Sequence, residues 1–178
     1  MALLVLLGGA RSGKSRLAVR LARETAAPVT IIATGEGRDD EMEARIAAHR
    51  AERPAEWETV EEPYALEQAI AAVASDRVLV VDCLSLWVAN ALERGEDGHA
   101  IEAAAAASAR AAAGRPSLTI VVSNEVGLGV VPPTPLGRMY RDLLGRVNST
   151  FVEASHEAVL VVAGRSLALV QPTVPDGS

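Results

Sequence analysis

The sequence is poor in cysteine, in aromatic residues and in long apolar runs. Cys83 is the only cysteine among 178 residues, which excludes an internal disulfide, and no Cys/His cluster has the spacing of a zinc site. The apolar stretch Ala2–Leu7 has no basic residue before it and is too short for a signal-peptide core or a membrane span. These absences favour a protein of the reducing cytoplasm without a membrane span.

Basic residues are also fewer than acidic ones. The chain has 17 Lys and Arg residues against 23 Asp and Glu residues, a net charge of −6, whereas a surface that neutralises nucleic-acid phosphates is normally basic. We therefore expect no nucleic-acid partner, and any anionic ligand must be held by a local group of residues.

Apolar residues, by contrast, make up 49% of the chain. A chain of this length and composition buries about 70% of its unfolded surface, which excludes intrinsic disorder. Its length favours a single domain over residues 1–178, with a disordered tail at 172–178.

Short β-branched runs alternate with longer helical patterns, as in βα units that feed a parallel sheet. The runs do not alternate with polar residues, so they predict strands that are buried on both faces. The predicted fold class is α/β, with a mostly parallel sheet flanked by helices. Strands are expected at Leu3–Leu7, Val29–Ala33, Val78–Val81, Leu118–Ser123 and Ala158–Ala163, with a weaker one at Ser166–Val170. Helices are expected near Lys14–Ala26, Asp39–His49, Tyr64–Ala74, Leu84–Glu93, Ala100–Ala113 and Leu136–Ser155.

A complete G-x-x-x-x-G-K-[ST] motif follows the first strand and precedes the first helix, the context that a phosphate-binding P-loop requires. Its glycines let backbone N–H groups surround a phosphate, and the helix dipole adds positive potential. We expect Lys14 to neutralise β- and γ-phosphate oxygens, and to face solvent when no nucleotide is bound. The Ser15 hydroxyl is expected to bind Mg²⁺. The motif consists of Gly8, Gly9, Ala10, Arg11, Ser12, Gly13, Lys14 and Ser15.

Asp82 directly follows the apolar run Val78–Val81. In this position an acidic residue acts as a Walker B group and would hold the metal near Ser15. The alternative is that Asp82 caps the helix that follows.

The segment Asp39–Pro54 predicts a short helix with acidic residues at its start and basic residues at its end. His49 would share the inward face of this helix with Met42 and Ile46, close to several arginines. One interpretation is a histidine that stabilises the C-terminal end of the helix. The other is a nucleophile for phosphorus, because a neutral imidazole is available near its ordinary pKa and neighbouring cations bind the phosphate.

Two segments interrupt the alternation of strands and helices. Arg94–His99 is rich in glycine and charge, which predicts a connecting loop. Glu125–Pro135 contains two glycines and three prolines directly after a predicted core strand. It should therefore lie at the carboxyl edge of the sheet, where ligands bind in open α/β folds.

Together, these motifs resemble the adenosylcobinamide kinase/adenosylcobinamide-phosphate guanylyltransferase family. The P-loop alone is too common to indicate a family. The block at 39–54, which contains His49, and the block at 123–132, which contains the sequence NEVG, are distinctive in combination. The resemblance rests on GGARSGKS at 8–15, Ala33-Thr34, DDEMEARIAAHRAERP at 39–54 with Trp57, Val81-Asp82, SNEVGLGVVP at 123–132 and GRVN at 145–148.

The resemblance implies a RecA-like P-loop NTPase fold, a homotrimer and two reactions. In the first, the hydroxyl of the aminopropanol arm of a corrinoid, adenosylcobinamide, takes the γ-phosphoryl group of ATP or GTP. In the second, a histidine attacks the α-phosphorus of GTP, expels pyrophosphate, and passes GMP to the phosphorylated corrinoid. By position, that histidine is His49.

Further nucleotide-site residues are implied by the same resemblance. They are Thr34, Gly35, Glu36, Arg50, Ala51, Glu52, Arg53, Glu61 and Asp82. Glu61 is a plausible acceptor for the two N–H donors of guanine, although a solvated surface carboxylate is the alternative.

Two other functions remain open from the residues themselves: a plain P-loop kinase for a small molecule, and a P-loop regulatory module that binds ATP. Covalent labelling by GTP discriminates between them and the bifunctional enzyme, because neither alternative would become guanylylated.

Overall fold

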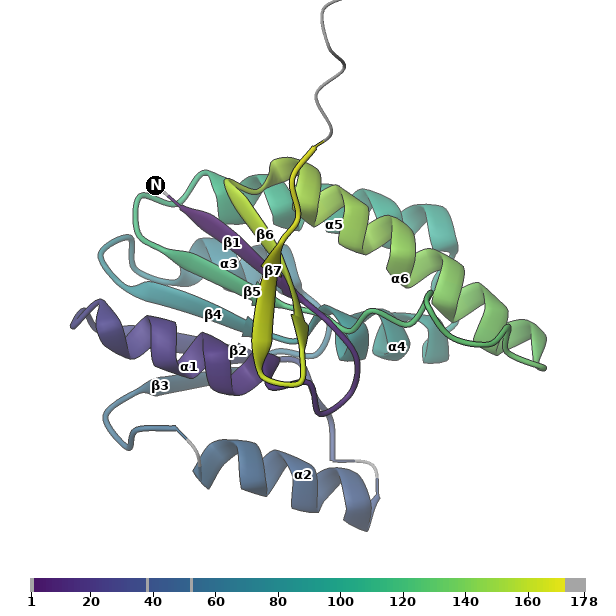
Figure 1. Ribbon diagram of the computed structural model, residues 1–178, viewed down its shortest axis with the longest axis horizontal. Coiled ribbons are helices and arrows are strands. Elements are labelled where there is room, and N and C mark those ends of the chain that lie inside the picture. The colour runs from purple at the N-terminus through teal and green to yellow at the C-terminus, as the bar shows by residue number, and fades with distance from the viewer. Residues whose placement is uncertain (1, 38, 52, 172–178) are drawn as a thin grey trace, which may run out of the picture.

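The computed structural model describes residues 2–37, 39–51 and 53–171, without the side chains of Glu41, Arg45 and His49 (Figure 1). The tail at 172–178 lies outside the described residues, so its predicted disorder stays a prediction. The described strands are β1 (Leu3–Leu7), β2 (Val29–Ala33), β3 (Glu58–Glu61), β4 (Val78–Asp82), β5 (Thr119–Val122), β6 (Glu157–Val162) and β7 (Arg165–Ala168). The described helices are α1 (Lys14–Glu24), α2 (Asp40–Ala51), α3 (Leu66–Ala72), α4 (Leu84–Glu93), α5 (Gly98–Ala113) and α6 (Pro135–Ala154).

The strands form one sheet in the order β3-β2-β4-β5-β1-β6-β7. Neighbouring strands are parallel except β6 and β7, which form an antiparallel hairpin. The register pairs Asp82 with Ala33 on one side and with Val122 on the other. Strands from distant parts of the sequence therefore end at one edge of the sheet.

A hydrophobic core lies on each face of the sheet. α1 covers one face through Ala18 and Ala22, and the larger core on the other face lies beneath α3, α4, α5 and α6 (Figure 1). The alanine-rich α5 buries Ile101, Ala105 and Ala109 along one stripe, because these residues are spaced by one helical turn. Neither core includes a described residue of α2, which projects beyond the β3 edge in Figure 1.

The predicted elements agree with the structure to within a few residues, except at β3. Its sequence Glu-Thr-Val-Glu lacks an apolar run, and only Val60 is partly buried. As an edge strand, β3 is hydrogen-bonded to one neighbour and needs little apolar surface, so hydrophobic patterning did not reveal it. None of the helices in the described part of the chain is long and apolar enough to cross a membrane.

A buried arginine ties the segment that follows α5 to α3 and to the α3–β4 connection. The Arg115 side chain is 7% exposed, and its guanidinium donates to the backbone oxygens of Ile70, Val73, Ala74 and Arg77 at 2.7–3.3 Å. Burial lowers the pKa of Arg115 from its usual range, but an arginine remains charged at neutral pH. One buried side chain thus supplies a hydrogen-bond donor to four backbone carbonyl groups.

We predict that Arg115→Met destabilises the fold. The substitution retains apolar volume but removes all the hydrogen bonds that the guanidinium donates to these four carbonyls, so the free energy of unfolding should fall by about 2–4 kcal/mol. Urea denaturation measures this change. Arg110→Met, on the exposed side of the last turn of α5, is the matched control and should stay within about 0.5 kcal/mol of the parent. Equal effects of the two substitutions would contradict the structural role of Arg115.

Candidate functional site

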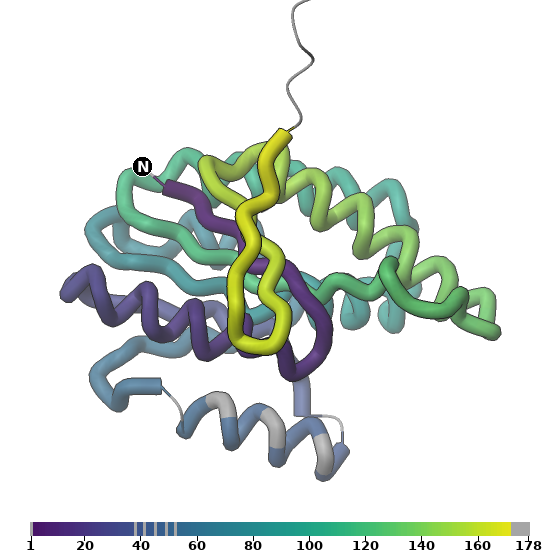
Figure 2. Tube along the Cα trace, in the orientation of Figure 1, coloured from purple at the N-terminus to yellow at the C-terminus, as the bar shows by residue number. Residues whose placement is uncertain are grey.

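The P-loop connects β1 to α1 in a conformation that depends on two of its glycines. Gly8 has φ +149° and lies so close to β6 that a Cβ atom would stand 2.2 Å from the Val161 carbonyl oxygen. Gly13 has φ +100° and forms the N-cap of α1. The β6–β7 turn supports the loop, since the Gly164 N–H donates to the Ser12 carbonyl oxygen at 2.8 Å (Figure 2). Both glycines are therefore required by backbone geometry.

Lys14, the only lysine in the sequence, is buried against this loop. Its side chain is 6% exposed, and Nζ donates to the carbonyl oxygens of Gly8 at 2.8 Å and Gly9 at 2.7 Å. The prediction that Lys14 faces solvent is therefore wrong. Its ammonium group lies in the interior, where the P-loop carbonyls accept its hydrogen bonds. Burial lowers the pKa of Lys14, and the negative charge of Asp82 opposes this shift.

Asp82 joins the P-loop helix to the segment that follows α2. Its Oδ1 accepts a hydrogen bond from the Ser15 hydroxyl at 3.3 Å. Its Oδ2 pairs with Arg53 at 3.4 Å, and the Arg53 side chain is only 9% exposed. The structure thus brings together Ser15, Arg53 and Asp82, which lie far apart in the sequence.

The hydroxyl and carboxylate oxygens of Ser15 and Asp82 suit a hard divalent cation. No group of three or more His, Cys, Asp and Glu side chains able to hold a metal occurs among the described residues. The chain therefore offers two oxygen donors next to a phosphate-binding loop. This donor set fits Mg²⁺, which is usually held by one or two protein oxygens together with substrate phosphates.

Thr34 lies at the end of β2 and is fully buried between β4 and α4. Its hydroxyl donates to the Cys83 carbonyl oxygen at 2.7 Å and accepts from the Cys83 N–H at 2.9 Å. Asn90 of α4 donates to the Thr34 carbonyl oxygen at 2.7 Å. Gly35 follows, and a Cβ there would stand 3.2 Å from Leu86 and 3.6 Å from Ile46, so α2 approaches α4 at this point.

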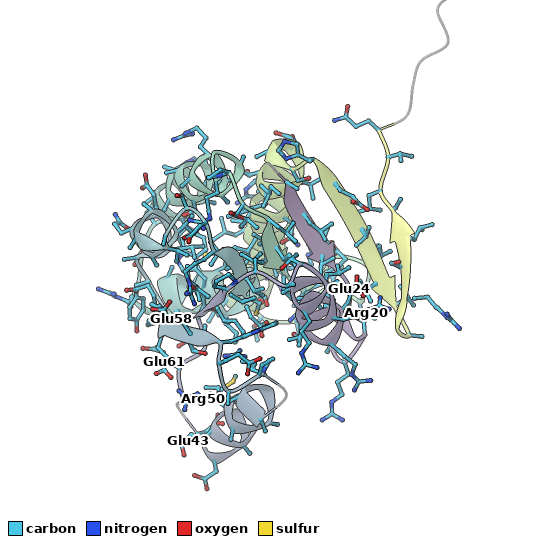
Figure 3. All side chains as sticks on the ribbon, turned by 90° about the vertical axis from the view of Figure 1, so that its left-hand side faces the viewer. Arg20, Glu24, Glu43, Arg50, Glu58 and Glu61 are labelled. Atoms are coloured by element: carbon cyan, nitrogen blue, oxygen red, sulfur yellow. The ribbon has the colours of Figure 1, made fainter. Side chains whose placement is uncertain are left out.

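The carboxylates on the β2–β3 side of the site have polar partners. Glu36 accepts from the Tyr64 hydroxyl at 2.7 Å. Arg50, near the end of α2, forms an ion pair with Glu61 at the end of β3, and Figure 3 shows the two side chains between these elements. Both side chains are more than half exposed. The C-terminal end of α2 is thus connected to the edge of the sheet.

The sequence also predicts roles in this site for His49 and Glu52, but the described structure does not test them. Position 49 belongs to α2, with its side chain outside the described residues, and Glu52 lies outside them entirely. Ala51 is exposed at the end of the helix. The predicted inward face is consistent with Met42 and Ile46, which are both partly buried.

Sequence patterns did not indicate several polar residues of this site. Asn90 occurs within the apolar pattern of α4. Only the structure shows that its side chain is buried, at 4% exposure, and that it holds the Thr34 backbone through a hydrogen bond. Tyr140 of α6 donates to the Ser85 carbonyl oxygen at 3.2 Å, and burial raises its pKa to about 12. Burial and the nearby Asp82 raise the pKa of the Cys83 thiol. These groups are therefore neutral at physiological pH and contribute hydrogen bonds rather than charge.

Comparison with known protein families identifies one match that spans nearly the whole chain. The sequence model of the family described as cobinamide kinase / cobinamide phosphate guanyltransferase matches residues 4–169. The bifunctional adenosylcobalamin biosynthesis protein CobP of Pseudomonas aeruginosa is 45% identical over 93% of this chain and 95% of its own length. The bifunctional adenosylcobalamin biosynthesis protein CobU of Escherichia coli is 38% identical over 91% of this chain and 96% of its own length.

Comparison with solved structures bears on the fold alone. A prototypical ATPase from the type III secretion system of pathogenic bacteria superimposes with a TM-score of 0.53 at 13% sequence identity, over 89% of this chain and 51% of that one. The predicted RecA-like P-loop NTPase fold, with a mostly parallel sheet flanked by helices, is confirmed.

We predict that Lys14→Ala weakens nucleotide binding far more than it weakens the fold. The ammonium group directly contacts the P-loop backbone, where a phosphate would bind, whereas the carbonyls that it leaves can bond to water. The dissociation constant for a nucleoside triphosphate, measured by calorimetry, should rise at least about tenfold, which corresponds to about 1.4 kcal/mol. Arg16→Ala, on the exposed side of the first turn of α1, is the control. Unchanged affinity would exclude a phosphate-binding role, and loss of the thermal transition would make Lys14 a structural residue.

Proposed function

The chain belongs to the cobinamide kinase / cobinamide phosphate guanyltransferase family, and on this premise we propose how its residues divide two reactions. The protein is a bifunctional transferase: a kinase for cobinamide and a guanylyltransferase for cobinamide phosphate. The observation that carries the assignment of residues is the convergence of the P-loop, Asp82 and Arg53 at one edge of the sheet. The P-loop, a metal ion at Ser15 and Asp82, and the Arg53 guanidinium can therefore all act on one bound nucleotide.

In the kinase reaction, the P-loop holds the phosphates of ATP or GTP. The backbone N–H groups of residues 8–15 and the N-terminal end of α1 stabilise the negative charge, and Lys14 leaves the loop carbonyls to contact the β- and γ-phosphates. The hydroxyl of the corrinoid then attacks the γ-phosphorus, and a nucleoside diphosphate leaves. Ser15 and Asp82 would hold Mg²⁺, which supplies charge neutralisation on the phosphate oxygens when it is bound.

In the guanylyltransferase reaction, His49 is the proposed nucleophile. Its imidazole attacks the α-phosphorus of GTP, pyrophosphate leaves, and the phosphate of the phosphorylated corrinoid then takes GMP from the histidine. The support is the resemblance of the block at 39–54 together with the position of residue 49 in α2. Arg50 is the next residue in α2 and Arg53 follows the end of the helix; they reach the sheet through Glu61 and Asp82.

The remaining nucleotide contacts are proposed on the β2–β3 side. Thr34, Gly35 and Glu36 follow β2, and Glu61 at the end of β3 is in register with Ala33, the last residue of β2. The Glu61 carboxylate can accept two hydrogen bonds from the guanine base once Arg50 turns toward a phosphate. Arg50, Ala51, Glu52 and Arg53 complete this proposed set. The homotrimer and the cytoplasmic location stay predictions.

We predict that Asp82→Asn raises the Mg²⁺ concentration needed for both reactions. The substitution retains the size of the side chain but removes the charge that attracts a divalent cation, and it also removes the charged partner of Arg53. Activity should reach half of its maximum at a Mg²⁺ concentration several-fold above that of the parent. Asp76→Asn, in the α3–β4 connection, is the control. The cap alternative is already excluded, because Cys83 is the N-cap of α4 and no side chain caps this helix. Overlapping titrations of Asp82→Asn and the parent would therefore remove Asp82 from the metal site and leave it as the partner of Ser15 and Arg53.

We predict that the parent protein gains the mass of one GMP on His49 when treated with GTP and Mg²⁺. The P–N bond should break in acid and survive alkali, because protonation makes imidazole a good leaving group. His49→Ala should abolish the adduct and guanylyl transfer while retaining most of the phosphoryl transfer, which depends on the P-loop. Intact-mass spectrometry and a kinase assay on the same samples measure both effects.

His99→Ala, at the start of α5, is the matched control and should form the adduct normally. An adduct that persists in His49→Ala would place the nucleophile elsewhere. A parent with good kinase activity and no adduct would support a plain P-loop kinase.

A further inference from the structure

Glu125 follows β5 at the carboxyl edge of the sheet, between the P-loop and Asp82. β5 is hydrogen-bonded to β1 on one side and to β4 on the other. The Glu125 N–H donates to the Gly8 carbonyl oxygen at 3.0 Å, the same oxygen that accepts a hydrogen bond from Lys14 Nζ at 2.8 Å. The backbone of Glu125 and the P-loop ammonium are therefore close neighbours, at the phosphate end of the site.

The backbone on either side of Glu125 is well fixed. The Asn124 carbonyl oxygen accepts from Asn148 of α6 at 3.0 Å, and Val126 packs against the larger core. Beyond Val126 the chain emerges into solvent, where Leu128 and Val130 are each more than 80% exposed. Glu125 thus stands between a well-held backbone and an exposed loop.

The other carboxylates at this edge are engaged by donors from side chains, whereas the donor to Glu125 is a backbone N–H. Asp82 contacts Ser15 and Arg53, Glu36 contacts the Tyr64 hydroxyl, and Glu61 pairs with Arg50. Glu125 Oε1 accepts from the Gly127 N–H at 2.5 Å, and no ion pair between described residues involves this carboxylate. Among the described residues of this edge, Glu125 thus has its backbone against the P-loop and a carboxylate that enters no ion pair.

We propose that Glu125 is the general base of the phosphoryl transfer, an assignment that rests on the proposed kinase function. As the corrinoid hydroxyl oxygen forms its bond to the γ-phosphorus, its proton passes to the Glu125 carboxylate. The bond between the γ-phosphorus and the β-phosphate oxygen breaks, and the nucleoside diphosphate leaves with that electron pair. The products are the phosphate ester, the diphosphate and a protonated Glu125, which returns its proton to water.

The guanylyltransferase reaction does not need this base. Its acceptor is a phosphate monoester that already carries a negatively charged oxygen, and a neutral imidazole has no proton to lose from its attacking nitrogen. Removing the carboxylate of Glu125 should therefore separate the two activities. A residue that only supports the fold or the nucleotide would affect both.

The test uses Glu125→Gln and Glu125→Asp in the full chain, with Glu24→Gln in the last turn of α1 as the matched control (Figure 3). With ATP and adenosylcobinamide, the kcat of Glu125→Gln should fall by about 100-fold or more, the range for loss of a general base, while KM for both substrates changes little. Glu125→Asp should recover part of the rate, because it retains a displaced carboxylate.

A second measurement supplies GTP and adenosylcobinamide phosphate directly. Glu125→Gln should form the GMP adduct and transfer GMP within about twofold of the parent. A kinase kcat within about threefold of the parent, a change in KM alone, or equal loss of both activities would overturn the role of Glu125. If the parent transfers GMP but does not phosphorylate the corrinoid, the kinase function itself fails, and the assignment of Glu125 fails with it.

Discussion

Parallel pairing in the centre of the sheet brings together strand ends that are far apart in the sequence. Asp82 is in register with Ala33 and Val122, and Val122 is in register with Leu6 of β1. The loops that follow these strands therefore start at one edge. The P-loop, Thr34, Asp82 and Glu125 all depend on this register, because a slip of one residue would turn each strand's side chains to the opposite face.

The protein concentrates positive charge locally although the chain as a whole is acidic. Its only lysine lies inside the P-loop, and Arg53 and Arg50 reach the same edge from the end of α2. Each of these cations has an oxygen partner in the structure: loop carbonyls for Lys14, Asp82 for Arg53 and Glu61 for Arg50. A nucleotide can replace these partners with phosphate oxygens, so the cations are held in place without being left unpaired in the interior.

The two proposed reactions use different sides of one nucleotide site. α2 lies beyond β3, on the side where Arg50 meets Glu61 and where position 49 is placed (Figures 1 and 3). Glu125 lies on the β5 side, next to the first glycine of the P-loop. A nucleotide bound by the P-loop between them would offer its γ-phosphate to one side and its α-phosphate to the other. With the roles proposed for Glu125 and His49, this division would let one site serve a general base and a histidine nucleophile in separate reactions.

The sequence by itself determined the central strands, the P-loop and the position of Asp82, because buried β-branched runs and a fixed glycine spacing leave few alternative conformations. It also determined the family, through motifs distributed along nearly the whole chain. Only the tertiary structure decided that β3 joins the sheet, that Lys14 is buried, and that Asn90 and Arg115 support distant backbone carbonyls. These features depend on which polar groups meet across the fold, and hydrophobic periodicity carries no information about such pairings.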